Sequence, residues 1–370
     1  MASSSDRIPY VNLEAQWKED REELLPIIDH LLSTGQYVGG SEIDRFEKQM
    51  AGLCSVRFAV ALNSGTDALT LALRLVGVGP GDEVITPPNS FVASTAVIMH
   101  LGAVPVFVDV LPDQNIDPDK IEAAITKKTK AIMPVHLSGR ICDMDPILEV
   151  AKDCGLRVVE DAAQAVGSKY KNRTSGSMGD IGCFSTHPLK NLNSCGDGGF
   201  LTTNDKSIYE MARTLRNHGM IDRNYIEHFG HVSRMDNLQA AILNYRIKKL
   251  DKIIANRRRN AQYYFDHIPP QKVILPFEKK YEFNSYHTFV IQVENRNELR
   301  EFLFDQGIET AIHYPTPIHL QPAAKGLGYK KGDFAVTEKQ AEKILTLPIN
   351  QYNTKNDLDF IIEAILQFVN

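Results

Sequence analysis

The sequence lacks both an apolar run long enough to span a membrane and an excess of positive charge. Its apolar stretches stay short of the about 20 residues that cross a bilayer, and the polar residues 1–7 precede no signal-peptide-like apolar segment. The 41 Lys and Arg residues are outnumbered by 46 Asp and Glu residues, which gives a net charge of −5. Nucleic acids and anionic membranes bind through concentrated positive charge. We therefore expect a protein that binds neither.

Cysteine is also scarce. There are five cysteines, an odd number, and none form a C-x-x-C pair, so neither a disulfide framework nor a metal cluster is indicated. Unpaired cysteines are typical of reducing compartments, which favours a cytoplasmic location. Hydrophobic residues make up 43% and charged residues 24% of the chain, close to the averages of globular proteins. Disordered, collagen-like and coiled-coil classes are thereby excluded.

Between residues 63 and 180, short apolar runs alternate with segments of helical periodicity. Runs such as AIMPV and LRVVE are typical of parallel strands buried on both faces of a sheet. The alternation predicts an α/β fold with a mostly parallel, doubly wound sheet. The predicted strands are 83–86, 104–108, 130–135, 156–160, 181–185 and 199–203, and the predicted helices are 66–76, 93–101, 118–125 and 144–154.

The C-terminal third has a different pattern. A long amphipathic stretch over residues 235–265 leaves the sheet, and we interpret it as the bridge between two domains. A strand at 287–293 and helices at 296–306 and 358–369 then predict a smaller α+β domain. The expected organisation is a large α/β domain with an N-terminal arm over residues 1–250 and a small domain over residues 251–370.

Ligands of open parallel sheets bind beyond the carboxyl ends of the strands, so the residues that follow each strand are the first candidates. Gly65, Thr66 and Asp67 lie in a polar turn that opens a helix, where free N–H groups and the positive end of the helix dipole could hold a phosphate. The alternative is an ordinary helix cap by Ser64 or Thr66. Phe91 also follows a strand, and its ring could stack on a bound aromatic ring or pack in the core.

Three further polar residues follow later strands. Asp161 ends the run LRVVED and could pair with a protonated ring nitrogen, or cap a helix in the segment AAQAVG. Lys190 lies in the loop HPLKN before GDGG, where it could be an amine nucleophile or a solvated charge. The Ser185 hydroxyl could donate to the same phosphate as the first loop. No single residue identifies a site, but their combination does.

Taken in order, SGTDAL, EDAAQA and HPLKN with GDGG resemble the DegT/DnrJ/EryC1/StrS family of sugar aminotransferases, which use pyridoxal 5′-phosphate (PLP) on the aspartate aminotransferase fold. The resemblance continues through IPYVNLEAQ, STGQYVGG, GPGDEVITPP, RMDNLQAAIL and PIHLQPA. It implies that Lys190 binds the cofactor aldehyde and then moves a proton. Asp161 would keep the pyridine nitrogen protonated, which makes the ring an electron sink. The other implied cofactor contacts are Gln164 at the ring hydroxyl, Phe91 on the ring, and Gly65, Thr66, Asp67 and Ser185 at the phosphate.

One position departs from the family pattern. Similar proteins carry an asparagine at the position of Val232, and it reaches the phosphate in the neighbouring subunit; valine cannot make that bond. Either Asn224, His231 or Ser233 takes its place, or the phosphate has fewer contacts, while Arg234 is retained. The resemblance also implies a homodimer with shared active sites.

The resemblance implies a nucleotide-linked keto sugar as acceptor and glutamate as amino donor. IPYVNLEAQ and STGQYVGG are most similar to members that act at carbon 3 of a hexose, in the biosynthesis of deoxyamino sugars such as those of lipopolysaccharide. The alternatives are a 4-keto sugar aminotransferase, a PLP-dependent sugar dehydratase and a catalytically silent regulatory protein. Lys190 argues against the dehydratase, because dehydratase relatives carry histidine in its place.

Other polar residues have two interpretations each. His187 either contacts substrate or packs over its loop, and we favour packing. In similar proteins the segment with His313, Tyr314, His319 and Gln321 extends toward the sugar of the adjacent active site, and loop packing is the alternative. The basic run at 257–259 could meet the nucleotide, but on a long helix it is expected to form a solvated face.

Overall fold

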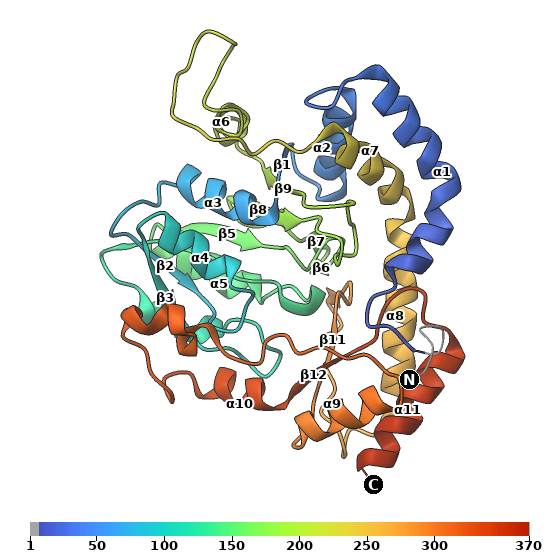
Figure 1. Cartoon of the computed structure of the whole chain (residues 1–370). Helices are drawn as coiled ribbons and strands as arrows, with labels where there is room; N and C mark the ends of the chain where they lie inside the picture. The colour runs from blue at the N-terminus through green and yellow to red at the C-terminus, as the bar shows by residue number, and fades with distance from the viewer. Residues whose placement is uncertain (1–6, 370) are drawn as a thin grey trace.

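The six strands predicted between residues 83 and 203 assemble into one sheet together with β1, a strand that is not predicted from the sequence. The computed structural model describes residues 7–369 and contains a seven-stranded sheet in the order β1-β9-β8-β5-β4-β2-β3 (Figure 1). The pairs β2–β3, β2–β4, β4–β5 and β5–β8 are parallel, while β9 is antiparallel to β1 and β8. The predicted fold class is confirmed. The strands are β1 Phe58–Leu62, β2 Glu83–Thr86, β3 Val104–Phe107, β4 Thr129–Ile132, β5 Arg157–Asp161, β8 Ile181–Ser185 and β9 Gly199–Thr203.

Helices cover both faces of this sheet. Neighbouring residues of a strand point to opposite faces, so Val159 packs with α3, α4 and α6 whereas Val158 packs with α5. The second face is completed by α2 and α7. Burial on both faces explains why the predicted strands read as continuous apolar runs. These helices are α2 Ser41–Leu53, α3 Gly65–Leu75, α4 Ala93–His100, α5 Met144–Asp153, α6 Lys206–Leu215 and α7 Asn237–Arg246.

A second core lies in the C-terminal segment. Helix α8 Leu250–His267 joins the two cores, because Ile254 packs beneath the large sheet and Tyr264 packs against the antiparallel pair β11 Phe289–Gln292 and β12 Ile344–Leu347. The proposed domain boundary falls at the start of this shared helix and stays a prediction. The remaining elements are α1 Leu13–Thr34, α9 Arg296–Asp305, α10 Ala335–Lys343, α11 Lys355–Val369, β6 Lys169–Tyr170, β7 Arg173–Thr174 and β10 Glu282–Phe283.

Two predicted elements need correction. Residues 118–125 form two short 3-10 helices, Pro118–Lys120 and Glu122–Ala124, and the backbone of Ile125 after them is already extended. The strand predicted over residues 287–293 is limited to Phe289–Gln292, because the His287 carbonyl and the Thr288 N–H bond to Arg257 and Ser138 instead of to a neighbouring strand. The other 3-10 helices are Leu137–Gly139, Ile247–Lys249, Ile318–Leu320 and Pro322–Leu327.

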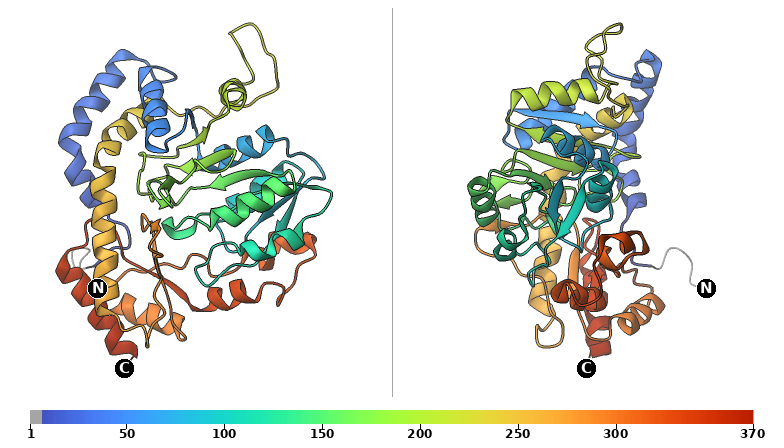
Figure 2. Two further views of the ribbon diagram at one scale, coloured as in Figure 1. Left: turned by 180° about the vertical axis from the view of Figure 1, so that it is seen from behind. Right: turned by 90° about the vertical axis from the view of Figure 1, so that its left-hand side faces the viewer.

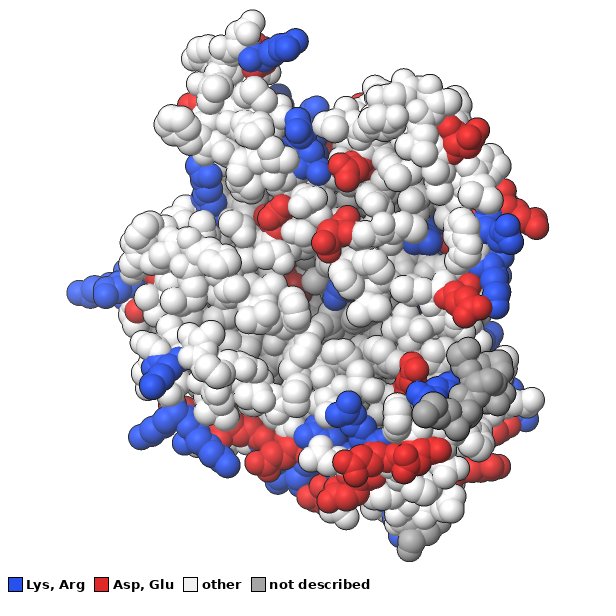
Figure 3. All heavy atoms as spheres, viewed as in Figure 1, with Lys and Arg blue, Asp and Glu red and all other residues white. Residues whose placement is uncertain are grey.

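The segment between α6 and α7 projects from the body as a long loop (Figures 1 and 2). On the face shown in Figure 3, charged side chains of both signs gather along the lower edge over the C-terminal elements, while the centre is hollowed and mostly uncharged. Within the described residues, no helix combines the length and apolar composition needed to cross a membrane.

Candidate active site

The turn before α3 has free donors and little room. Ser64 caps the helix: its hydroxyl accepts from the Asp67 N–H at 3.0 Å, and its carbonyl accepts from Ala68. The N–H groups of Gly65 and Thr66 therefore come first in α3, and within residues 7–369 neither donates a hydrogen bond. A Cβ on Gly65 would lie 2.7 Å from the Cβ of Ser185, so glycine lets the helix end approach β8. Both interpretations of this turn therefore hold: Ser64 caps the helix, and two free N–H groups remain for a phosphate.

Asp67 has a different environment from its neighbours. Its backbone N–H is used by the cap, and its carboxylate accepts a hydrogen bond from the buried Ser233 hydroxyl at 2.7 Å. A carboxylate facing a phosphate would repel it. The Asp67 side chain thus fastens the segment around Ser233 to the start of α3.

Asp161 ends β5 in a buried position with two donors. Its carboxylate accepts from the Ser94 hydroxyl at 2.8 Å and from the Ala163 N–H at 3.2 Å. Burial raises the pKa of Asp161, against these hydrogen bonds and the charge of Lys190. Residues 162–167 form turns rather than the helix that Asp161 could have capped. A buried carboxylate of this kind can hold a protonated nitrogen.

The carboxylate of Glu160, the residue before Asp161, is bound by other residues of the fold. It accepts N–H bonds from Gly176, Met178 and Gly179 and pairs with His136 Nε2 at 2.9 Å. These donors keep the pKa of Glu160 below its usual value despite complete burial. Of the two adjacent acids, only Asp161 remains available to a ligand.

Lys190 lies in a turn held from both sides. Its N–H donates to the His187 carbonyl at 2.8 Å, and the next residue, Asn191, donates to the Ser285 carbonyl at 3.1 Å. Burial lowers the pKa of Lys190 to about 8, and the charge of Asp161 opposes that shift. A sizeable fraction of the amine is thus neutral near physiological pH. A neutral amine is the form that attacks an aldehyde.

Phe91 and Gln164 flank these two charged groups. The Phe91 ring is 54% exposed and lies 5.9 Å from the Tyr314 ring between centroids, so Phe91 is not a core residue. The Gln164 side chain accepts from the Ser138 N–H at 2.8 Å. An exposed ring near the carboxyl ends of the strands offers a surface for stacking.

The predicted histidines separate into two groups. Burial and the charge of Lys190 lower the pKa of His313 to about 4, while burial and the charge of Asp161 raise the pKa of Tyr314 to about 12. The expected extension of this segment toward the adjacent active site stays a prediction. His319, in contrast, is buried against Phe334 and bonds to Glu338 at 3.0 Å, which is a packing role. His187 is exposed, and its ring accepts from the Leu189 N–H at 3.3 Å.

Sequence reasoning missed Arg257 and His287. Arg257 is only 5% exposed and donates to the carbonyls of Tyr286 and His287, both at 3.1 Å, so the predicted solvated face is wrong for this residue. Arg258 is half-buried and pairs with Glu278, and Arg259 alone is exposed. A signal existed, because Arg257 follows Leu250, Ile253 and Ile254 at helical spacing on the buried face of α8.

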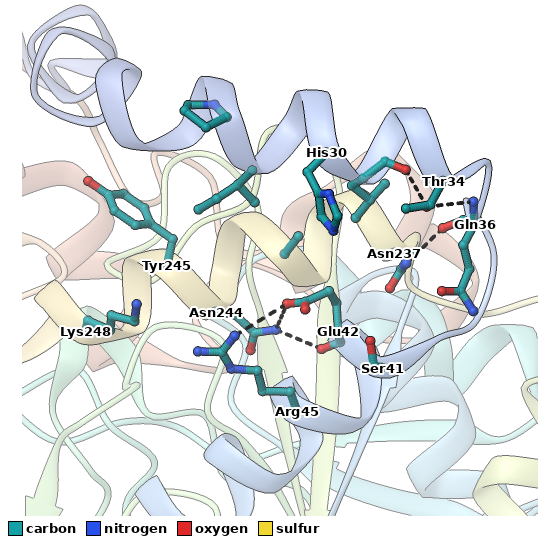
Figure 4. Close-up of a pocket in the computed structure, with 14 residues that line it drawn as sticks. His30, Thr34, Gln36, Ser41, Glu42, Arg45, Asn237, Asn244, Tyr245 and Lys248 are labelled. Atoms are coloured by element: carbon teal, nitrogen blue, oxygen red, sulfur yellow. Dashed lines mark hydrogen bonds and ion pairs between the residues drawn. The ribbon is translucent and has the colours of Figure 1, made fainter.

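A separate hollow of about 350 Å³ between α1, α2 and α7 contains none of the predicted site residues (Figure 4). Asn244 donates to both the carbonyl and the carboxylate of Glu42, and Asn237 donates to the Gln36 carbonyl. These side chains hold the connection between α1 and α2 against α7. The hollow is therefore part of the packing of this region.

The residues around Lys190 fit PLP. Free N–H groups suit a phosphate, a buried carboxylate suits a pyridinium, an exposed ring suits its face, and a partly neutral lysine suits its aldehyde. When bound, PLP supplies a ring that stabilises negative charge on the carbon bearing the amino group. This combination on a doubly wound sheet defines the class: a PLP-dependent enzyme of the aspartate aminotransferase fold.

Comparison with known proteins identifies the family. The model of the DegT/DnrJ/EryC1/StrS aminotransferase family matches residues 18–366, and the chain belongs to that family, whose cofactor is PLP. It is 39% identical to a dTDP-3-amino-3,4,6-trideoxy-alpha-D-glucose transaminase of Streptomyces venezuelae over 99% of this chain and 97% of the relative. It is 40% identical to a UDP-N-acetyl-3-dehydro-alpha-D-glucosamine 3-aminotransferase of Acidithiobacillus ferrooxidans over 92% of each chain. The crystal structure of S. venezuelae DesV superposes with a TM-score of 0.95 at 39% identity, over 98% and 99% of the two chains.

Proposed function

We propose that the protein transfers an amino group from glutamate to the keto carbon of a nucleotide-linked sugar, at carbon 3 of a hexose. The observation that carries this proposal is the pair of Lys190 and Asp161 at the carboxyl ends of β8 and β5. The acceptor follows from the two curated relatives, which are named for amino transfer to dTDP- and UDP-linked sugars at carbon 3. The product would be a deoxyamino sugar of the kind built into polysaccharides such as lipopolysaccharide.

The side chains divide the work of the reaction. Asp161 holds the proton on the ring nitrogen, because a buried anion favours the charged form of its partner. Lys190 Nζ, once displaced by the amino donor, takes a proton from the carbon that bears the amino group and returns one in the second half-reaction. Its pKa of about 8 suits both directions, since neither the neutral nor the charged form is strongly disfavoured near pH 7–8.

The projecting loop supports a homodimer with shared active sites. Phe229 of this loop is 92% exposed, and Ile221, Tyr225, Ile226 and Val232 are exposed as well. Apolar surface of this kind is normally covered by another protein surface, and a second copy of the chain is the partner we propose. Ser233 turns inward to Asp67, which leaves Asn224 and His231 as the candidates to replace the family asparagine.

The competing functions are separated by chemistry. A dehydratase would require PLP without nitrogen transfer, and a silent regulatory protein would not bind PLP through Lys190. The lowered pKa of Lys190 and the hydrogen bond from Ser94 to Asp161 favour an active transferase over a dehydratase or a silent regulatory protein. All five cysteines are unpaired, in keeping with the expected cytoplasmic location.

The test is turnover with labelled glutamate. The PLP-loaded protein is incubated with ¹⁵N-glutamate and a panel of nucleotide-linked 3-keto and 4-keto sugars, and 2-oxoglutarate release and product mass are measured. We expect ¹⁵N in the product of a 3-keto sugar. Turnover restricted to 4-keto sugars would overturn the carbon-3 assignment, and sugar conversion without ¹⁵N would identify a dehydratase.

A further inference from the structure

Basic side chains lie in the C-terminal segment that contacts the turn of Lys190, where the Asn191 side chain donates to the Ser285 carbonyl at 3.1 Å. His287 and His313 are partly exposed, and Arg257 lies behind His287, to whose carbonyl it donates at 3.1 Å. The charges of Lys190, Arg257 and His313 all act on His287. Four groups able to carry positive charge are thus gathered here, while Asp161 is the acid whose charge acts on Lys190.

Arg257 makes this group unusual. A buried arginine is normally paired with a carboxylate, yet within residues 7–369 no Asp or Glu lies within 4.0 Å of the Arg257 guanidinium. Its Nη1 donates only to the carbonyls of Tyr286 and His287, and its buried Nε donates to no described atom. Among the described residues, no carboxylate therefore compensates the positive charge of this arginine.

His287 also lacks a hydrogen-bond partner: its Nδ1 is buried without one among the described residues, while the ring remains partly accessible. His313, in contrast, uses Nδ1 in a bond with the Thr346 hydroxyl at 2.9 Å, which fixes its ring. Burial and neighbouring charges lower the pKa of both histidines, so the imidazoles contribute N–H donors while Arg257 contributes the positive charge. Within residues 7–369, no carboxylate pairs with Arg257 or with either ring.

We propose that His287, His313 and the positive charge of Arg257 bind the carboxylate attached to the reacting carbon of the amino donor. This inference rests on the proposed function and adds to it the residues that recognise the donor. A carboxylate here would compensate Arg257 and accept hydrogen bonds from imidazole N–H groups. The residues are positioning and binding residues rather than proton carriers.

The location of the group favours a carboxylate over a phosphate. In an α-amino acid the carboxylate is bonded directly to the carbon that carries the amine, so it must lie beside Lys190. In a nucleotide-linked 3-keto sugar the nearest phosphorus is separated from the keto carbon by two ring carbons and an oxygen, so the pyrophosphate must lie farther away. The phosphate of the cofactor has its own donors at Gly65 and Thr66. The donor carboxylate is therefore the anion that must lie beside Lys190, and the turn of Lys190 contacts the segment of His287 through the bond from Asn191 to the Ser285 carbonyl.

The test measures binding of an unreactive dicarboxylate. Glutarate has the carboxylates of glutamate but no amine, and its dissociation constant for the PLP-loaded protein is measured by isothermal calorimetry. We expect glutarate to bind at least about tenfold more tightly than the neutral glutaramide, which is about 1.4 kcal/mol. Arg257→Met and His287→Leu should each weaken glutarate binding about tenfold. Arg258→Met is the matched control, because Arg258 is on the same helix but already paired with Glu278, and we expect less than a twofold change.

The outcomes separate this inference from the proposed function. Borohydride reduction first establishes, for each variant, that PLP is attached to Lys190. If attachment persists and glutarate binds equally well to wild type, Arg257→Met and His287→Leu, the donor site lies elsewhere and the inference is wrong. If the wild type shows no attachment at Lys190, the proposed function fails instead. Equal binding of glutarate and glutaramide by the wild type would overturn the inference without any variant.

Discussion

Two buried arginines on consecutive helices have opposite surroundings. Arg246 of α7 donates from Nε to Asp20 at 3.0 Å and from Nη1 to the Asn193 carbonyl at 2.8 Å. Arg257 of α8 is equally buried but meets only two backbone carbonyls. Charges in the framework of a fold are paired, because an unpaired buried charge destabilises it. A buried charge left unpaired beside reactive groups indicates where a ligand of opposite charge arrives.

The Arg246 network also reaches the active site. Asn193 exchanges hydrogen bonds with Gln16 of α1 at 2.8 and 3.0 Å and donates to the Pro188 carbonyl at 2.6 Å. The turn that contains Lys190 is therefore tied to α1 and α7. The paired arginine supports the position of Lys190, and the unpaired arginine lies behind His287 in the proposed donor site.

The largest expected effect is on stability and comes from breaking the paired arginine. Arg246→Met leaves Asp20 buried with Lys249 as its only cation, so we expect the free energy of unfolding to fall by about 3–5 kcal/mol. Urea denaturation measures it. Adding Asp20→Leu should recover part of the loss, and a loss below about 1 kcal/mol would contradict the pairing.

Arg257→Met should cost less stability than Arg246→Met. It leaves no buried charge behind, only two carbonyls without their donor, so we expect a loss of about 1–3 kcal/mol in the same denaturation experiment. If Arg257→Met were the more destabilising of the two, the comparison would be reversed and Arg257 would be a framework residue.

The link between the network and Lys190 is tested by Gln16→Ala. This variant removes the hydrogen-bond partner of Asn193. We expect the free energy of unfolding to fall by about 1 kcal/mol and a smaller fraction of the protein to retain PLP on dialysis. Gln16→Glu, which keeps an acceptor, should retain more PLP. Identical PLP retention in the wild type and both variants would show that the loop after Lys190 keeps its position without the contact to α1.

The smallest effect is a shift in pH. With PLP removed, the amine of Lys190 is charged below its pKa of about 8 and neutral above it, so its acetylation by acetic anhydride should rise through pH 8 rather than through 10.5, the usual lysine value. In Asp161→Asn the midpoint should move lower still, because the Asp161 charge favours the ammonium. Peptide mass spectrometry follows the acetylation of Lys190 at each pH. A midpoint near 10.5 would contradict the prediction and place the amine in bulk solvent.

The sequence predicts those residues whose position follows from strand order. Lys190, Asp161 and Phe91 each come just after a strand, and parallel strands bring their carboxyl ends to one edge. The alternation of apolar runs likewise predicts six of the seven strands of the sheet; the edge strand β1 and the antiparallel direction of β9 are not predicted.

Contacts between distant segments are what the sequence does not reveal. Ser94 meets Asp161, and His287 approaches Lys190, through tertiary packing alone. The motif with His319 looks chemical, yet Glu338 and Phe334 bury that ring in packing. Arg257 is the intermediate case, since the spacing of α8 indicates burial but not the absence of a carboxylate.

One measurement tests the central claim most directly. The PLP-loaded protein is reduced with borohydride, digested and mapped by mass spectrometry, which finds any lysine that has bound the cofactor aldehyde. The account predicts a single pyridoxyl group on Lys190, lost when the protein is first incubated with glutamate. A pyridoxyl group on another lysine, or none at all, would contradict it.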